Sequence, residues 1–256
     1  MIPNSQPPKL SIITICYNAE KYIFDTFNSI REQTNKKFEY IVIDGSSTDT
    51  TLDLIKTNSD IIDCWHSEPD DGIADAMNKG IAKSKGEYII FLHADDYFVD
   101  SLSVERILQS VESNEDIVVF DVLFESNGIK EAASPRKFNI YTKLKLPFCH
   151  QGVVCSRKLF DRVGGFDKNF RITMDYDFFL RAYLTKASCK LVPHPLSVFR
   201  DTGISSRTDW SSLVERFDEE KQAHFKNCNS VLWFVLYRMW WCLYPLYRKF
   251  KYIVQR

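Results

Sequence analysis

The sequence predicts an α/β fold in which a single Rossmann-like, mostly parallel sheet is flanked by helices. Two observations support this prediction. Over roughly the first hundred residues, short apolar runs rich in β-branched side chains alternate with longer segments in which apolar residues recur at helical spacing. In addition, 45% of the 256 residues are hydrophobic, which is enough for a substantial core and argues against disorder.

Four strands with intervening helices are expected in the N-terminal part of the chain. Residues 10–17 are too apolar for a strand with one side in solvent, and Ile23, Phe27 and Ile30 then follow at the spacing of one helix face. The helical pattern of residues 73–81 is broken by Gly86. The expected strands span residues 10–17, 38–44, 61–66 and 87–92. This β-α-β alternation places the C-terminal ends of the strands at one edge of the sheet, where ligands bind in such folds.

Polar residues follow three of these strands at the point where each strand ends. They are Tyr17 and Asn18, Asp44 beside Gly45, and the group His93, Asp95 and Asp96. Adjacent carboxylates are costly to bury unpaired, but they are the hard oxygen ligands that Mg²⁺ or Mn²⁺ prefers when phosphates and water supply the other ligands. The alternative is that Asp95 and Asp96 cap and begin a helix that starts near Ser101.

Composition narrows the class of protein. The net charge of −1 argues against a wholly basic nucleic-acid binder. The seven cysteines are an odd number and form no C-x-x-C pair, so neither a disulfide scaffold nor a structural zinc site is expected, and a reducing cytosol is predicted. The first ten residues lack the basic and apolar regions of a signal peptide, so export is not expected. None of these features predicts an oligomeric state.

Four ordered blocks of sequence carry a resemblance. They are LSIITICYNAEKYIFDTFNSIREQT, FEYIVIDGSSTDTT, SEPDDGIADAMNKGIAKSKGEYIIFLHADD and GGFDKNFRITMDYDFFLRA. Together they resemble the family 2 glycosyltransferases, inverting enzymes of GT-A fold, over roughly residues 9–205. The resemblance implies a catalytic domain over residues 1–205, with a nucleotide-sugar half at 9–100 and an acceptor half at 101–205. It also implies a UDP-sugar donor whose diphosphate is bridged by Mn²⁺ or Mg²⁺.

The same resemblance assigns residues to the donor. The residues implied to bind the nucleotide or the donor sugar are Thr14, Tyr17, Asn18, Asp44, Glu68, Asp70, His93 and Asp95. Tyr17 is suited to stack on the base, although it could equally be a buried aromatic residue. Many family members carry a second acid after the first at the end of the second strand, whereas this chain has Gly45. Glu68 and Asp70 could instead be surface acids that precede a helix.

The metal motif departs from the pattern of the family. Members usually read Asp-x-Asp-Asp, and here His93 replaces the first acid, so Asp95 is the expected metal ligand, with Asp96 and His93 as further candidates. Some relatives supply another ligand from a histidine shortly after an arginine. Thr202 occupies that neighbourhood after Arg200 in this chain.

An inverting transfer needs a carboxylate that accepts the proton of the attacking hydroxyl. Asp175 stands where the family carries this catalytic acid, and the alternative is that it caps a helix. The resemblance also implies acceptor or diphosphate contacts from His150, Gln151, Arg157 and Arg200. His150 could instead be a core residue.

The C-terminal residues 206–256 are predicted to form a helical extension that associates with a membrane. Residues 231–256 contain five Lys or Arg, no acid and many aromatic residues, which is typical of an interfacial helix. The apolar stretch from Val231 to Tyr247 is interrupted by Arg238 and Pro245, so it falls short of the roughly 20 apolar residues that a span requires. The alternative is a helix packed on the catalytic domain.

Together these features predict a metal-dependent hexosyltransferase at the cytoplasmic face of the cell membrane. It would transfer glucose, galactose or an N-acetylated relative from a UDP-sugar to a lipid-diphosphate-linked saccharide, with a β-linked product, in O-antigen, capsule or exopolysaccharide synthesis. Two other classes stay open at this point. A sugar nucleotidyltransferase would share the sheet and the acids, although no Gly-rich phosphate loop follows the first strand. A non-catalytic, membrane-associated sugar-binding protein would share the fold.

Overall fold

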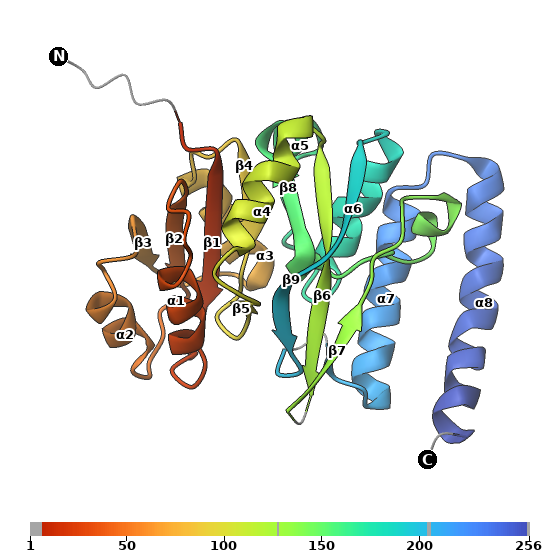
Figure 1. Cartoon of the computed structure of the whole chain (residues 1–256). Coiled ribbons are helices and arrows are strands. Elements are labelled where there is room, and N and C mark those ends of the chain that lie inside the picture. Colours follow the sequence, from red (N-terminus) through yellow and green to blue (C-terminus); the bar gives the residue numbers. More distant parts are fainter. Residues whose placement is uncertain (1–6, 127, 204–205, 255–256) are drawn as a thin grey trace.

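The structure is a computed structural model that describes residues 7–126, 128–203 and 206–254. One nine-stranded sheet runs in the order β3-β2-β1-β4-β8-β6-β9-β5, and β7 pairs with β6 outside this order (Figure 1). The strands are β1 (Leu10–Cys16), β2 (Glu39–Asp44), β3 (Cys64–Ser67), β4 (Tyr88–Phe91), β5 (Tyr97–Phe98), β6 (Ile117–Ser126), β7 (Ile129–Ala133), β8 (Val153–Ser156) and β9 (Cys189–Arg200).

Helices connect most of these strands. The α-helices are α1 (Ile23–Arg31), α2 (Thr51–Thr57), α3 (Ile73–Lys83), α4 (Ser103–Ser110), α5 (Arg157–Val163), α6 (Met174–Leu184), α7 (Trp210–Lys226) and α8 (Val231–Val254). Short 3₁₀ helices are η1 (Val111–Ser113), η2 (Ile140–Lys143) and η3 (His150–Gly152). The strands and helices expected in the first hundred residues are therefore confirmed. The helix expected near Ser101 begins at Ser103 and comes after β5, so Asp95 and Asp96 lie in a loop and do not cap it.

The expectation of a mostly parallel sheet is confirmed for one half of the molecule and wrong for the other. The strands β3, β2, β1 and β4 are all parallel. Beyond β4, β8 runs antiparallel to both β4 and β6. β7 pairs antiparallel with β6, and β5 pairs antiparallel with β9. The parallel pair of this half is β6 with β9. A strand buried on both faces has the same apolar composition in either direction, so its sequence does not reveal the direction.

Side chains that alternate along the strands belong to two hydrophobic cores, one on each face of the sheet. Ile13 packs with Met77 of α3 and Phe179 of α6 on one face, whereas Ile12 packs with Phe27 of α1 on the other. Full burial of each such side chain contributes about 1.5–3 kcal/mol. The two cores fix the loops at the C-terminal ends of the parallel strands, and these loops carry most of the predicted site residues.

The two C-terminal helices extend the α6 side of the molecule, with α8 outermost (Figure 1). His224 of α7 lies at their centre. Its Nδ1 accepts a hydrogen bond of 2.8 Å from the Trp241 indole, and its ring stacks on Tyr237 at 4.4 Å. Its Nε2 therefore carries the proton and donates to the Tyr176 hydroxyl of α6 at 2.7 Å. Burial lowers the pKa of His224 to about 3, which agrees with a neutral ring.

The helix α8 thus has two different faces. One face packs on α7, which packs in turn on α6 of the predicted catalytic domain. The other face remains apolar and exposed, with Leu232, Met239, Leu243, Leu246, Phe250 and Ile253 each more than half exposed. Within the described ranges, no helix is long and apolar enough to cross a membrane.

Candidate active site

The loops after β1 and β2 form one wall of the candidate site. Tyr17 is 63% exposed at the end of β1. Asn18, in the left-handed region at φ 50°, ties the two loops together, because its amide oxygen accepts from the Thr48 N–H at 2.8 Å and its own N–H donates to the Ser47 hydroxyl at 2.8 Å. The predicted donor residues Tyr17 and Asn18 are therefore at the expected edge of the sheet.

Gly45 leaves a space that two predicted donor residues border. A Cβ atom at this position would lie 2.4 Å from a carboxylate oxygen of Asp70 and 3.5 Å from the Tyr17 ring. Any larger residue would push Asp70 away. Asp70 itself accepts from the Gly72 N–H at 2.9 Å, and Glu68 is held by His66 at 3.0 Å and by Lys79. The structure therefore brings Asp70 to Tyr17, which are 53 positions apart in the printed sequence.

Two of the predicted donor contacts require correction. Thr14 is completely buried, and its hydroxyl is within hydrogen-bond distance of the Leu92 carbonyl and the Tyr40 hydroxyl. Asp44 is also completely buried, where its carboxylate accepts from the Ser67 hydroxyl at 2.6 Å and from the Ser47 backbone N–H. Neither side chain has exposed surface to offer a ligand, because both are covered by the groups that they bond to. In this structure they stabilise the strand ends: Thr14 bonds to Leu92 after β4, and Asp44 bonds to Ser47 after β2 and to Ser67 of β3.

The loop after β4 presents the two acids in different environments. Asp95 is partly exposed and accepts from the Thr202 hydroxyl at 2.5 Å. Asp96 is 1% exposed, and neither of its carboxylate oxygens has a hydrogen-bond partner. Burial, and then the charge of Asp95, raise the pKa of Asp96 well above its ordinary value. Asp96 is therefore corrected from metal ligand to a buried residue of the loop.

The remaining residues fit a divalent cation that takes most of its ligands from elsewhere. Asp95 is one accessible carboxylate at a strand end, next to a second, buried carboxyl group. Throughout the described residues, no group of three His, Cys, Asp or Glu side chains is arranged to hold a metal. Such a site suits Mg²⁺ or Mn²⁺ bound through one carboxylate together with phosphate oxygens and water.

His93 and His150 form a buried pair beside this loop. Their rings stack with centroids 5.2 Å apart, and His93 Nδ1 and His150 Nε2 have no hydrogen-bond partner. Burial lowers the pKa of both, in the case of His150 to about 3. The pair is therefore neutral at pH 7. The structure therefore brings His93, predicted for the donor or the metal, next to His150, predicted for the acceptor.

Asp175 lies in the first turn of α6, where it accepts from the Tyr176 N–H at 2.7 Å. Burial is the main cause that raises the pKa of Asp175 to about 6, and the negative charge of Glu220 adds to it. This is the pKa range that suits a general base near neutral pH.

The predicted acceptor and diphosphate residues are divided by the structure. The Arg157 guanidinium donates to the Gly86 carbonyl at 2.8 Å and to the Ser84 hydroxyl at 2.7 Å, both of which precede β4. Arg157 is thus at the opposite edge of the sheet from Asp95, and the predicted diphosphate contact is wrong. Sequence could not show this, because β8 runs antiparallel to β4 and carries the end of its strand to that edge.

Arg200 lies next to Asp95 but is already engaged. Its guanidinium pairs with Asp25 at 2.6 Å and Glu125 at 3.3 Å, and it donates to the Asp95 carbonyl at 3.3 Å. Its position is near the site, as predicted, while its charge is balanced by two carboxylates. Gln151 follows His150 directly in the chain, and its backbone carbonyl accepts a hydrogen bond of 2.7 Å from the Ser197 hydroxyl.

The sequence prediction missed that α7 builds part of the site. Glu219 accepts from the backbone N–H groups of Arg171, Ile172 and Thr173 at 2.8–2.9 Å, and so holds the segment that begins α6. Glu220, next to it, acts on Asp175 through its charge. The predicted boundary at residue 205 therefore does not separate the catalytic residues from the extension. A carboxylate on a solvated helix gives no sequence signal of this role.

We expect Glu219→Ala to lower the free energy of unfolding by about 2–4 kcal/mol, because three backbone donors at a helix start lose a charged acceptor. Turnover should fall with it, since Asp175 follows two residues after Thr173. Thermal unfolding and initial rates measure the two effects. Glu215→Ala, an exposed acid one turn earlier on α7, is the matched control and should change neither. Equal stability of both variants would contradict the role of Glu219.

The α/β sheet, with an accessible acid after β4 and a second acid at the start of α6, defines a class of enzyme that acts on nucleotide-activated sugars. Residues 11–175 match the family model described as "Glycosyl transferase family 2". This chain belongs to that family, and it is a glycosyltransferase that depends on a nucleotide-sugar donor. Family membership sets aside the nucleotidyltransferase and the non-catalytic sugar-binding protein.

Relatives by sequence include glycosyltransferases of Mycobacterium tuberculosis. The chain is 30% identical over 186 residues to a PGL/p-HBAD biosynthesis glycosyltransferase of that organism. This alignment covers 70% of this chain and 72% of the relative. It is also 30% identical over 220 residues to an uncharacterized glycosyltransferase of the same organism, which covers 80% of each chain.

Solved structures share the fold. Residues 1–349 of TarS from S. aureus, in complex with UDP-GlcNAc, align with a TM-score of 0.69 and 20% identity over 87% of this chain and 68% of theirs. The mannosyltransferase PcManGT from Pyrobaculum calidifontis, in complex with GDP-Man and Mn²⁺, aligns with a TM-score of 0.64 and 18% identity over 91% of this chain and 68% of its own.

Proposed function

We propose that this protein is an inverting, metal-dependent hexosyltransferase that transfers a sugar from a UDP-sugar to a lipid-diphosphate-linked saccharide. The observation that carries the proposal is Asp175, a partly exposed carboxylate at a helix start whose pKa is raised to about 6. Asp95, the accessible acid after β4, would hold the diphosphate of the donor. A base and a diphosphate site in one cleft are what a single displacement at the anomeric carbon requires.

In the proposed reaction, Asp175 accepts the proton of the acceptor hydroxyl as the oxygen attacks the anomeric carbon. The bond from that carbon to the diphosphate breaks, UDP leaves, and the configuration inverts to give a β-linked product. Mn²⁺ or Mg²⁺, when bound through Asp95, would neutralise charge on the departing diphosphate. Tyr17 and Asp70, on either side of Gly45, would bind the nucleoside, and the neutral pair His93 and His150 would face the sugar.

UDP as the carrier is supported by two observations of different kinds. The exposed Tyr17 ring offers a stacking surface for a base, and TarS, which shares the fold, is described in complex with UDP-GlcNAc. PcManGT, in complex with GDP-Man, shows that the fold also accepts a guanine nucleotide. The donor must therefore be identified by experiment.

The experiment is a screen for nucleotide release. The full chain with Mn²⁺ is incubated with UDP-glucose, UDP-galactose and their N-acetylated forms, together with diphosphate-linked saccharide acceptors, and UDP is measured. We expect one UDP-sugar to support release only when acceptor is present. GDP-mannose and ATP serve as comparison donors. Release from GDP-mannose alone, or consumption of ATP, would overturn the proposed donor.

We also propose that α8 lies on the cytoplasmic face of the membrane that holds the acceptor, as in assembly of O-antigen, capsule or exopolysaccharide. Its exposed face is apolar, and its basic residues, Arg238 and Lys249 among them, are accompanied by no acid between residues 231 and 256. Apolar burial at about 1.5–3 kcal/mol per side chain and about 1 kcal/mol for each basic residue near anionic headgroups would hold the helix peripherally.

Because Tyr237 and Trp241 pack on α7, removal of residues 231–256 would expose the core, so point substitutions are the better test. We expect Leu246→Glu combined with Ile253→Glu to reduce co-sedimentation with anionic liposomes at least tenfold, since both side chains lie on the exposed face. Ile129→Glu, on β7 and 65% exposed, is the control and should bind as the wild type does. Unchanged binding of the double variant would exclude α8 as the membrane surface.

A further inference from the structure

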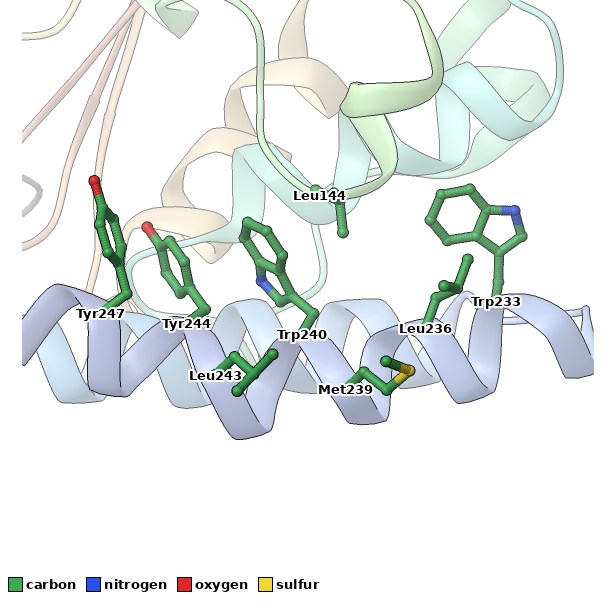
Figure 2. Close-up of a pocket in the computed structure, with 8 residues that line it drawn as sticks. All are labelled: Leu144, Trp233, Leu236, Met239, Trp240, Leu243, Tyr244 and Tyr247. Carbon is green, nitrogen blue, oxygen red and sulfur yellow. The ribbon is translucent and has the colours of Figure 1, made fainter.

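A groove of about 500 Å³ runs between α8 and the segment that follows η2 (Figure 2). Leu144 overhangs one side, and Trp240, Leu243 and Tyr244 are among the residues that α8 contributes. Every lining residue is aliphatic, aromatic or methionine. Trp240 stacks on Tyr244 at 4.6 Å, which makes a flat apolar floor, and the indole N–H of Trp240 has no partner.

Two cations border this groove on the side of the catalytic domain. Lys143 lies over the Trp233 ring at 4.4 Å, and Lys145 lies over the Tyr244 ring at 4.7 Å. They flank Leu144 in the chain. Lys145 is paired with Glu220, whereas Lys143 forms no ion pair with any described residue, and no acid occurs between residues 231 and 256. The positive charge of Lys143 and of α8 is therefore complementary to an anion next to a hydrocarbon.

The groove leads toward the candidate base through one ion pair and one charge interaction. Lys145 forms an ion pair with Glu220, the same residue whose charge acts on Asp175. From Leu144 the chain reaches Cys149 in five residues, which span at most about 17–18 Å when fully extended, and His150 of the candidate site follows directly. From α8 toward Asp175, the order of features is therefore the apolar groove, the two lysines and the carboxylate base.

We propose that the groove binds the hydrocarbon chain of the acceptor lipid, with Lys143 at its phosphate and the sugar hydroxyl at Asp175. This inference rests on the proposed function and deepens it, because it assigns recognition of the acceptor to its tail as well as to its saccharide. A lipid-linked saccharide has the same order of parts: hydrocarbon, phosphate, then sugar. Neither a detached phosphate nor a soluble saccharide would use an apolar groove of this size.

The test measures binding of farnesyl phosphate to the full chain below the critical micelle concentration of the lipid, by calorimetry and by the fluorescence of the tryptophans beside the groove. We expect Leu144→Glu to weaken binding at least tenfold, because a carboxylate would enter the apolar wall. Leu246→Glu, on α8 outside the groove lining, is the matched control and should bind as the wild type does. Lys143→Ala should reduce the preference for farnesyl phosphate over farnesol several-fold.

Leu144→Glu should retain the unfolding temperature of the wild type and its turnover with a short, soluble acceptor. Equal affinity of Leu144→Glu and wild type for farnesyl phosphate would overturn the proposal. So would sedimentation showing that the wild type is a dimer, that Leu144→Glu is a monomer and that farnesyl phosphate has no effect, because the groove would then hold a second copy of the chain. Farnesyl phosphate binding without any sugar transfer would refute the proposed function and leave the groove assignment intact.

Discussion

Asp175→Asn is expected to lower kcat by about 10²–10⁴-fold while UDP still binds. The amide keeps the size of the side chain, and its oxygen can still accept from the Tyr176 N–H, so the start of α6 should be preserved. What is lost is the ability to accept a proton at neutral pH. Steady-state rates and calorimetric titration with UDP measure the two quantities. Asp218→Asn, an exposed acid on α7, is the control and should leave both unchanged.

The pH dependence offers an independent check on the same residue. Because burial raises the pKa of Asp175 to about 6, the base is protonated and inactive below that pH and ionised above it. We therefore expect kcat/KM to rise with pH through about 6 and then to level off. The product should be β-linked by NMR. An α-linked product, or a rate that does not change between pH 5 and 7, would contradict Asp175 as the base of an inverting transfer.

Asp95→Ala is expected to abolish turnover, because it removes the one accessible carboxylate of the β4 loop that can hold a divalent cation. Chelator-treated wild type should be inactive and should recover on addition of Mn²⁺ or Mg²⁺. Full activity of the wild type in chelator would exclude a metal-dependent reaction. Mn²⁺ binding to the protein with UDP present, followed by magnetic resonance, gives a measurement that does not depend on turnover.

The neighbouring acid is the sharpest control for this prediction. Asp96 is buried, and its pKa is raised well above the ordinary value, so Asn is close to the neutral acid in size and charge. We expect Asp96→Asn to keep activity within about tenfold of the wild type and to remain sensitive to chelator. If Asp96→Asn and Asp95→Ala lose activity equally, the distinction between the two acids is wrong.

Local pattern was sufficient for the features that depend on short stretches of chain. The helical spacing of Ile23, Phe27 and Ile30, and the apolar runs that end at Tyr17, Asp44 and His93, predicted the parallel strands β1, β2 and β4 and the edge at which their ends meet. The reason is that side-chain periodicity is set within each element, and right-handed β-α-β connections leave few arrangements. The four motif blocks likewise identified the family and the helix start that carries Asp175.

Tertiary structure decided which of these residues face a ligand. Thr14 and Asp44 are predicted donor contacts, yet both are completely buried, because hydrogen-bond partners from other segments, such as Tyr40 and Ser67, cover them. Arg157 follows a strand whose direction its composition does not reveal. Glu219 stabilises the start of α6 from 46 positions beyond Thr173, and the two faces of α8 became distinct only when one met α7. Contacts between distant segments fix these outcomes, and no local sequence pattern encodes them.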